Sequence, residues 1–207
     1  MNVKCVVAKI LKILLNPPAI NNCVLEKESK IGPRSELTKC KIGRYTYIGQ
    51  QAFMVNVEVG AFCSIADRVT IGGANHPIEY VSSSPVFHEG KNVFRKNFSK
   101  HPVNHTPITI IENDVWIGQG AFIKAGVVIH TGAVIGMGSV VTHDIPPYEV
   151  WAGNPAKFIK KRFSDDVIQK LIMTKWWEYN NQDLDRIAVK FNNPDVFLEC
   201  FETENKR

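Results

Sequence analysis

The chain has 207 residues, of which 44% are apolar, which is enough for one sizeable hydrophobic core with a small appendage. Its formal net charge of +5 is mild, and a local cluster of Lys157, Lys160, Lys161 and Arg162 favours a site for one small anionic ligand over a nucleic-acid-binding face. Five scattered cysteines without a CxxC motif argue against a disulfide framework or a zinc ribbon, and they predict reduced thiols in a cytoplasmic protein.

Residues 1–20 are predicted to form an N-terminal amphipathic helix and a lead-in to the main domain. The apolar run in MNVKCVVAKILKILL is interrupted by Lys9 and Lys12, is too short to span a bilayer, and has no small-residue cleavage site. The Asn16-Pro17-Pro18 segment is expected to end the helix. We expect this helix to pack on its own protein or on a sister subunit, with contact to a membrane surface through residues 1–15 as the less favoured alternative.

An internal repeat of six residues dominates the middle of the chain. From Ile111 onward, a large aliphatic residue recurs at every sixth position: Ile111, Ile117, Ile123, Ile129, Ile135 and Val141. Four places after each of the first five comes a small or β-branched residue: Val115, Ala121, Val127, Ala133 and Ser139. An earlier block follows the same rule, with register slips, at Ile31/Ser35, Ile42/Thr46, Ile48/Ala52, Val59/Cys63 and Ile65/Val69.

A period of six fits neither a helix nor an alternating strand, but it fits a triangular coil with one short side and one corner per hexad. The large and small residues then share the interior, and each turn stacks on the next through parallel-strand hydrogen bonds. No single turn can bury its own aliphatic face, so only the stack is stable. The sequence therefore predicts a mainly β protein, a parallel β-helix of hexapeptide repeats over residues 21–157.

The same register assigns structural roles to several residues that resemble catalytic groups. Cys63 occupies a small inward position and is expected to fill the core rather than act as a nucleophile. Gly118-Gln119-Gly120 and Gly136-Met137-Gly138 lack the strand and helix of a dinucleotide-binding loop, and the corners of the coil explain them. On register alone, His130 and His143 are expected to be exposed turn residues.

The repeat stops after Ile71-Gly72 and resumes near Ile108, which predicts an extruded loop at about residues 73–107. A loop this long in a compact repeat protein usually has a function, here as the wall of a binding site. His76 occupies an outward place at the start of the loop, where an imidazole suits the task of a general base. His101 and His105 lie four apart with His88 nearby, but Pro102 interrupts the helix that such a spacing would need, so metal binding is the minority hypothesis.

Residues 158–207 are predicted to form a C-terminal helical extension. Ser164 is expected to cap a helix over DDVIQKLIMTKWWEYN, with Trp176 and Trp177 as packing residues. The stretch DLDRIAVKFNNPDVFLECF is expected to add one short helix, and ETENKR to fray.

The motifs together resemble a known family. The segments VGAFCSIADRVTIGGANHP, SSSPVF and ITIIENDVWIGQGAFIKAGVVIHTGAVIGMGSVVTHDIPPYEVWAGNPAK are similar to the xenobiotic acetyltransferase branch of the hexapeptide-repeat acyltransferases. This branch includes chloramphenicol and streptogramin acetyltransferases and many polysaccharide O-acetyltransferases. The resemblance implies a left-handed coil, a homotrimer with active sites between subunits, and a bacterial cytoplasmic enzyme.

The resemblance also implies roles for individual residues. His76, in the NHP motif, would take the proton from an acceptor hydroxyl as its oxygen attacks the thioester of acetyl-CoA, so that no acyl-enzyme and no metal are needed. Trp116 would line the floor of the cleft near the thioester, and Lys157 and Lys160 would meet the phosphates of CoA. The remaining positions that match family contacts to CoA are Gln119, Gly120, Met137, Gly138, Thr142 and His143. Trp151 stands where the family usually has a small aliphatic residue, which leaves the contacts at the CoA end open.

The leading hypothesis is acetyl-CoA-dependent O-acetylation of a saccharide, such as a surface polysaccharide or its precursor. The loop offers hydrogen-bonding side chains for a hydroxyl-rich acceptor: Ser82, Ser83, Asn92, Arg95 and Lys96. O-acetylation of an antibiotic is an alternative, because Phe87, Phe94 and Phe98 could form a more apolar wall. N-acetylation of a nucleotide-linked amino sugar is a third option, and a zinc enzyme like the gamma-class carbonic anhydrases, with His76, His101 and His105 as ligands, is an alternative from another class. The sequence alone indicates neither the identity of the acceptor nor the group that stabilises the negative charge on the acetyl oxygen during transfer.

Overall fold

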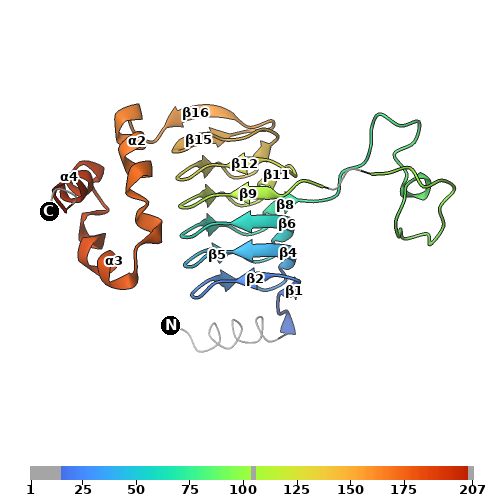
Figure 1. Cartoon of the computed structure of the whole chain (residues 1–207), viewed down its shortest axis with the longest axis horizontal. Coiled ribbons are helices and arrows are strands. Elements are labelled where there is room, and N and C mark those ends of the chain that lie inside the picture. Colours follow the sequence, from blue (N-terminus) through green and yellow to red (C-terminus); the bar gives the residue numbers. More distant parts are fainter. Residues whose placement is uncertain (1–14, 104–105, 205–207) are drawn as a thin grey trace.

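The computed structural model describes residues 15–103 and 106–204, with side chains to residue 201, and shows a coil of short parallel strands (Figure 1). The first face of the coil consists of β1 (Ala19–Asn21), the start of β4 (Glu36–Ile42), the start of β6 (Phe53–Val59), β8 (Thr70–Gly72), β11 (Phe122–Ile123) and β14 (Val140–Val141). The second face consists of β2 (Val24–Leu25), the ends of β4 and β6, β9 (Thr109–Ile111) and β12 (Val128–Ile129). The third face consists of β3 (Lys30–Ile31), β5 (Tyr47–Ile48), β7 (Ser64–Ile65), β10 (Trp116–Ile117), β13 (Val134–Ile135) and β15 (Glu149–Ala152).

The hexad register is what holds the coil together. Glu36 pairs with Phe53, which pairs with Thr70, so one turn takes 17 residues here, and it takes 18 where Phe122 pairs with Val140. The inward aliphatic residues stack in columns and are almost completely buried, as predicted: Ile48, Ile65, Ile117, Ile135, Ile71, Ile123, Ile111 and Ile129. Burying such a side chain contributes about 1.5–3 kcal/mol relative to leaving it exposed. The predicted fold class, a mainly β parallel β-helix of hexapeptide repeats with an extruded loop and C-terminal helices, is confirmed.

Cys63 confirms its predicted structural role. Its side chain is fully buried, and burial raises the pKa of the thiol to about 12, so the reactive thiolate is suppressed at neutral pH. The thiol donates to the backbone oxygen of Glu112 at 2.9 Å.

Trp151 closes the upper end of the hydrophobic column. It pairs with Ile135 on the inward side of the third face, and its indole packs against the coil core and edge-on against the ring of Phe158. The indole N–H donates to the Glu149 carboxylate at 2.8 Å, so the polar end of this large side chain is satisfied at the rim. A final strand, β16 (Lys157–Lys161), runs antiparallel to β15 and completes this end.

The long insertion leaves the coil at the corner between the first and second faces, after β8, and returns before β9. It projects away from the coil on the side opposite the C-terminal helices (Figure 1), and a single 3-10 turn, η1 (Pro85–Phe87), is the regular element of its described part. The prediction for residues 1–14 lies outside the described residues. No helix within 15–103 and 106–204 is both long and apolar enough to cross a membrane.

The C-terminal extension contains more and shorter helices than predicted. Ser164 caps α2 (Asp165–Thr174), where its hydroxyl accepts from the Val167 N–H, as predicted. The helix does not reach Asn180, because Lys175 adopts a left-handed conformation and η2 (Trp176–Glu178) follows. The rest holds α3 (Asn181–Ile187), η3 (Ala188–Lys190) and α4 (Pro194–Glu204) instead of one short helix, with Asn180 capping α3.

These helices pack against the corner between the second and third faces of the coil. The Arg44 guanidinium donates to the carbonyl oxygens of Trp177, at 2.9 Å, and of Tyr179. The rings of Phe62 and Trp176 lie 5.0 Å apart, which confirms Trp176 as a packing residue. This corner is therefore covered, and the coil offers its other two corners and its faces to ligands.

Candidate functional site

His76 lies at the beginning of the extruded loop, four residues beyond the end of β8, and its side chain is exposed. Its Nδ1 atom is 2.8 Å from the carbonyl oxygen of Ser83. A carbonyl oxygen can only accept a hydrogen bond, so Nδ1 must carry the proton in this contact. In the neutral imidazole the lone pair is then on Nε2, which is the state that a general base needs.

The His76 ring borders a hollow of about 290 Å³, formed where the two ends of the loop approach each other. Its described lining residues are Asn75, His76, Pro77, Glu79, Tyr80, Pro102, Val103 and Pro107. A second hollow, of about 480 Å³, lies farther out in the loop and is lined by Glu79, Tyr80, Val81, Ser82, Phe87, Ser99 and His101. Glu79 and Tyr80 belong to both linings, so the two hollows adjoin along these residues.

Tyr80 lines both hollows and is held by contacts within the loop. Its hydroxyl donates to the Pro102 carbonyl oxygen at 3.0 Å, and its ring meets the imidazoles of His88 and His101 edge-on, each with a centroid separation of 6.0 Å. His88 is 4% exposed, and its Nε2 has no hydrogen-bond partner among the described residues. Together these contacts give the loop a small core of its own.

The histidines of the minority metal hypothesis do not gather with other ligands in the part of the chain that the structure describes. Residues 15–103 and 106–204 hold no group of three or more His, Cys, Asp or Glu side chains placed to bind a metal ion. His105 lies outside the described residues.

Four of the residues predicted to contact CoA lie together on the corner between the third and first faces. The Gly138 N–H donates to the Gln119 carbonyl oxygen at 2.9 Å, which stacks Met137-Gly138 on Gln119-Gly120, and the Gly120 N–H donates to the Asp67 carbonyl oxygen at 3.0 Å. Met137 is 80% exposed, and among the described residues, apart from the adjoining ones in the chain, no atom lies within 4 Å of the place where a Cβ would sit on Gly120 or Gly138. This corner is an open edge that runs along the coil.

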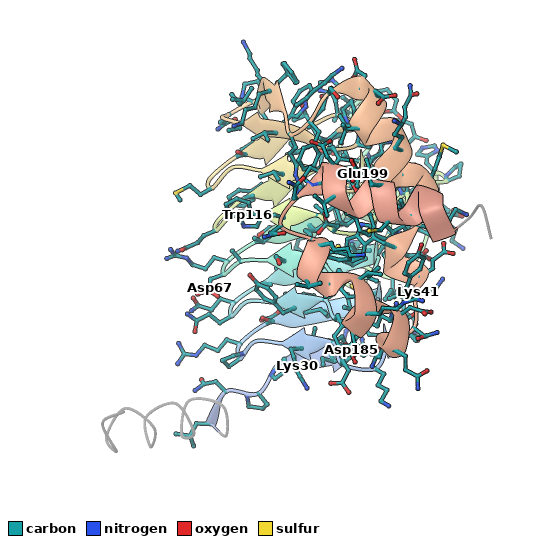
Figure 2. All side chains as sticks on the ribbon, turned by 90° about the vertical axis from the view of Figure 1, so that its left-hand side faces the viewer. Lys30, Lys41, Asp67, Trp116, Asp185 and Glu199 are labelled. Atoms are coloured by element: carbon teal, nitrogen blue, oxygen red, sulfur yellow. The ribbon has the colours of Figure 1, made fainter. Side chains whose placement is uncertain are left out.

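Trp116 occupies the third face of the coil, between Ser64 and Val134 in the strand register, and is 56% exposed. It lies to the left of the C-terminal helices in Figure 2, which do not cover it. An exposed indole on a β-helix face has little packing value there, so it is available to an incoming ligand.

Thr142 and His143 lie on a different corner, the one from which the loop departs. The Thr142 hydroxyl and His143 Nδ1 are 2.9 Å apart, and His143 is exposed, as the register predicts. His130 is half-buried instead of exposed, because its Nδ1 contacts the Glu112 carboxylate at 3.0 Å.

The basic cluster divides into two pairs. Lys161 contacts Asp165, and Arg162 contacts Asp114 at 3.2 Å, so these two residues attach the C-terminal helices. Lys157 and Lys160, on β16, are exposed and form no ion pair with a described residue. Of the four basic residues of the cluster, the two predicted to meet phosphates are therefore the two that form no ion pair with a described residue.

One chain does not bring all the predicted residues together. The hollow beside His76 contains none of the residues predicted to bind CoA, which lie on the third face, on two corners and on β16. The Ser83 carbonyl, Glu79 and Tyr80 emerge only from the structure, since no residue spacing signals a backbone oxygen that orients an imidazole seven positions away.

The fold and the repeats define a parallel β-helix protein of the hexapeptide type, and the family described as bacterial transferase hexapeptide (six repeats) matches residues 108–143. A probable macrolide acetyltransferase from Lysinibacillus sphaericus is 37% identical over 147 residues, covering 68% of this chain and 76% of the relative. The chain therefore belongs to the hexapeptide-repeat acetyltransferases.

Two further comparisons extend the likeness. A chloramphenicol acetyltransferase from Klebsiella aerogenes is 38% identical over 133 residues, and the match spans 59% of each chain, less than two thirds of that relative's length. The crystal structure of a maltose O-acetyltransferase from Clostridium difficile 630 superposes with a TM-score of 0.51 at 28% identity, covering 70% of this chain and 72% of that one.

Proposed function

We propose that the chain is an acetyl-CoA-dependent O-acetyltransferase in which His76 is the general base. The hydrogen bond of His76 carries this proposal, because a carbonyl oxygen at Nδ1 requires the proton there and leaves the lone pair of the neutral ring on Nε2 to accept another. His76 Nε2 takes the proton of an acceptor hydroxyl while its oxygen bonds to the acetyl carbonyl carbon. The carbon–sulfur bond then breaks, and the sulfur of CoA leaves as a thiol after it receives a proton.

The open corner and β16 are proposed to bind CoA. Backbone groups around Gln119-Gly120 and Met137-Gly138 would border the pantetheine arm, Trp116 would lie near the thioester, and Thr142 and His143 would flank its path. Lys157 and Lys160 would meet the phosphates, which suits two exposed ammonium groups that form no ion pair with a described residue. The relatives named above are acetyltransferases, which supports acetyl-CoA as the donor.

For the acceptor, we favour an amphiphilic hydroxyl compound of the antibiotic type over a simple saccharide. Of the five polar loop residues that suggested a saccharide, only Ser82 lines the larger hollow, while Tyr80, Val81 and Phe87 give it an apolar wall. Asn92 supports the loop itself, since its amide donates to the Pro85 and Lys96 carbonyl oxygens. A saccharide hydroxyl remains the second candidate, supported by the likeness to a maltose O-acetyltransferase.

The test is acetyl transfer measured by release of the CoA thiol. His76→Ala should lower kcat at least about a hundredfold, the usual contribution of a general base, while CoA affinity measured by calorimetry stays within about twofold. His130→Ala, which removes a histidine bonded to Glu112 elsewhere on the coil, is the matched control and should keep wild-type turnover. Normal turnover by the His76 variant would refute the assignment.

We further propose a homotrimer in which neighbouring chains share each site. Two observations support it: the His76 hollow lacks the CoA residues, and the loop carries exposed apolar side chains at Ile78, Val81 and Phe94. If sites are shared, mixed assemblies of His76→Ala and Trp116→Ala chains should contain some intact sites and exceed the activity of either variant alone. Activity equal to the mean of the two pure variants would argue for sites within single chains.

A further inference from the structure

The charges of the extruded loop are distributed unevenly with respect to its two hollows. Residues 73–107 contain four basic side chains, Lys91, Arg95, Lys96 and Lys100, and only two acidic ones, Glu79 and Glu89. None of the four basic residues lines either hollow. Lys96, for example, places its ammonium over the ring of Phe98, 4.5 Å from the centroid.

The one carboxylate that lines the hollows, by contrast, belongs to both. Glu79 is part of the lining beside His76 and of the lining around Tyr80, Val81 and Phe87, and it is exposed. It forms no ion pair with a described residue. A predominantly basic loop therefore presents a negative charge to whatever occupies the hollows, a few residues along the chain from the proposed base.

We infer that the acceptor carries a protonated amine close to its reacting hydroxyl, and that Glu79 binds this ammonium group. The inference rests on the proposed function and narrows its substrate class. The hydroxyl would lie at His76 Nε2, the ammonium at the Glu79 carboxylate, and an apolar body against Tyr80, Val81 and Phe87. Tyr80, which is anchored by its hydrogen bond to Pro102 and lines both hollows, would lie between the two parts of the acceptor.

The same charge pattern separates the rival acceptors. A nucleotide-linked sugar carries phosphates, which would be repelled by Glu79 and would find no lysine or arginine among the described residues lining the hollows. A neutral saccharide can donate a hydroxyl hydrogen bond to the Glu79 carboxylate, but it brings no positive charge to balance it. A cationic, partly apolar alcohol matches the proposed base, the carboxylate and the apolar side chains of the two linings.

The experiment uses three probes that share a cyclohexanol ring and differ only in the vicinal substituent: dimethylamino, isopropyl or carboxylate. Binding to the full-length protein is measured by calorimetry, and transfer is measured separately by thiol release. The amine probe should bind tightest and the carboxylate weakest. Glu79→Gln should weaken binding of the amine probe by about fivefold, the upper end for an exposed ion pair, and leave the isopropyl probe unchanged. The difference should shrink at high salt.

Glu89→Gln removes the other loop carboxylate, which lines neither hollow, and should change none of these affinities. Glu79→Lys should reverse the order, so that the carboxylate probe binds better than the amine. Equal binding of the three probes, no binding of any of them, or an unchanged amine affinity in Glu79→Gln would overturn the inference. Binding that depends on Glu79 without any acetyl transfer would instead refute the proposed function and leave the role of Glu79 intact.

Discussion

Substitution of Gly132 by alanine tests whether the coil and the C-terminal extension form one packed unit. It lies at the covered corner with φ of 73°, in the left-handed region. A Cβ on this residue would come within 2.5 Å of Cδ1 and Cε1 and 2.8 Å of Cγ of the Tyr148 ring. Tyr148 is 2% exposed and lies under the Arg162 guanidinium, whose Cζ is 5.1 Å from the ring centroid, so the ring has little room to move aside.

Gly132→Ala should therefore lose stability for two separate reasons. The left-handed conformation costs an alanine about 1–2 kcal/mol, and overpacking against a fixed ring adds about 1–3 kcal/mol. Gly138→Ala is the matched control, because Gly138 has φ of 66° at another corner, and no described residue beyond its chain neighbours lies within 4 Å of its Cβ position. It should show the first cost alone, about 1–2 kcal/mol.

The measurement is the free energy of unfolding in urea, with all variants at one protein concentration because the proposed trimer would contribute to stability by mass action. Tyr148→Leu in the Gly132→Ala background should recover part of the extra loss, since a smaller side chain relieves the contact. Equal destabilisation by Gly132→Ala and Gly138→Ala would show that the ring yields freely, and it would refute the idea of a rigidly packed corner.

Two further predictions concern charged side chains. The double variant Lys157→Ala with Lys160→Ala should weaken CoA binding by about tenfold at low salt and make the binding less salt-sensitive. The control Lys30→Ala, at the other end of the coil, should change neither property. A CoA affinity of the double variant that calorimetry finds unchanged would count against contact with the phosphates. Burial raises the pKa of Asp114 above its ordinary value of 3.8, although the Arg162 guanidinium opposes this shift. Ionisation of Asp114 is therefore less favourable in the folded chain than in the unfolded chain. This loss of stability grows as the pH rises above the pKa of the unfolded chain, and it disappears on acidification. Relative to Asp114→Asn, wild type should therefore gain stability as pH falls from neutral toward that value, and a pH-independent difference in unfolding free energy would contradict this.

The coil was predictable because its signal is local and repeated. Each hexad must place a large residue inward, so Ile117 and Ile135 and their equivalents report the register directly in the sequence. The position at which the repeat breaks could be predicted for the same reason, and this break in the pattern indicated the loop and His76 at its start. The hydrogen-bond partner of His76 could not be predicted from the sequence, because it is the backbone oxygen of Ser83 and the contact depends on how an irregular loop folds back on itself.

The C-terminal helices were predicted less well for a related reason. Ser164 is a local capping signal and was correct, but the end of α2 is set by Lys175 in a left-handed conformation, for which lysine has no particular preference. Arg44 and Phe62, more than a hundred residues earlier, hold the segment that follows. Such long-range contacts leave no periodic trace in the sequence.

The corners of the coil show how one repeat can serve both packing and binding. Gly132 and Gly138 look alike in sequence, and both have positive φ. At Gly132 the Tyr148 ring occupies the space that a Cβ atom would need. Packing therefore requires glycine at this position, and the ring closes the corner. At Gly138 no described residue beyond the chain neighbours occupies this space, and the adjacent Met137 side chain is 80% exposed. A glycine that opens a surface without filling it lets a ligand approach the backbone closely, which is the property that a binding edge along the coil needs. The neighbours of each glycine, not the glycine itself, therefore distinguish the corner that carries the C-terminal helices from the corner that we propose for CoA.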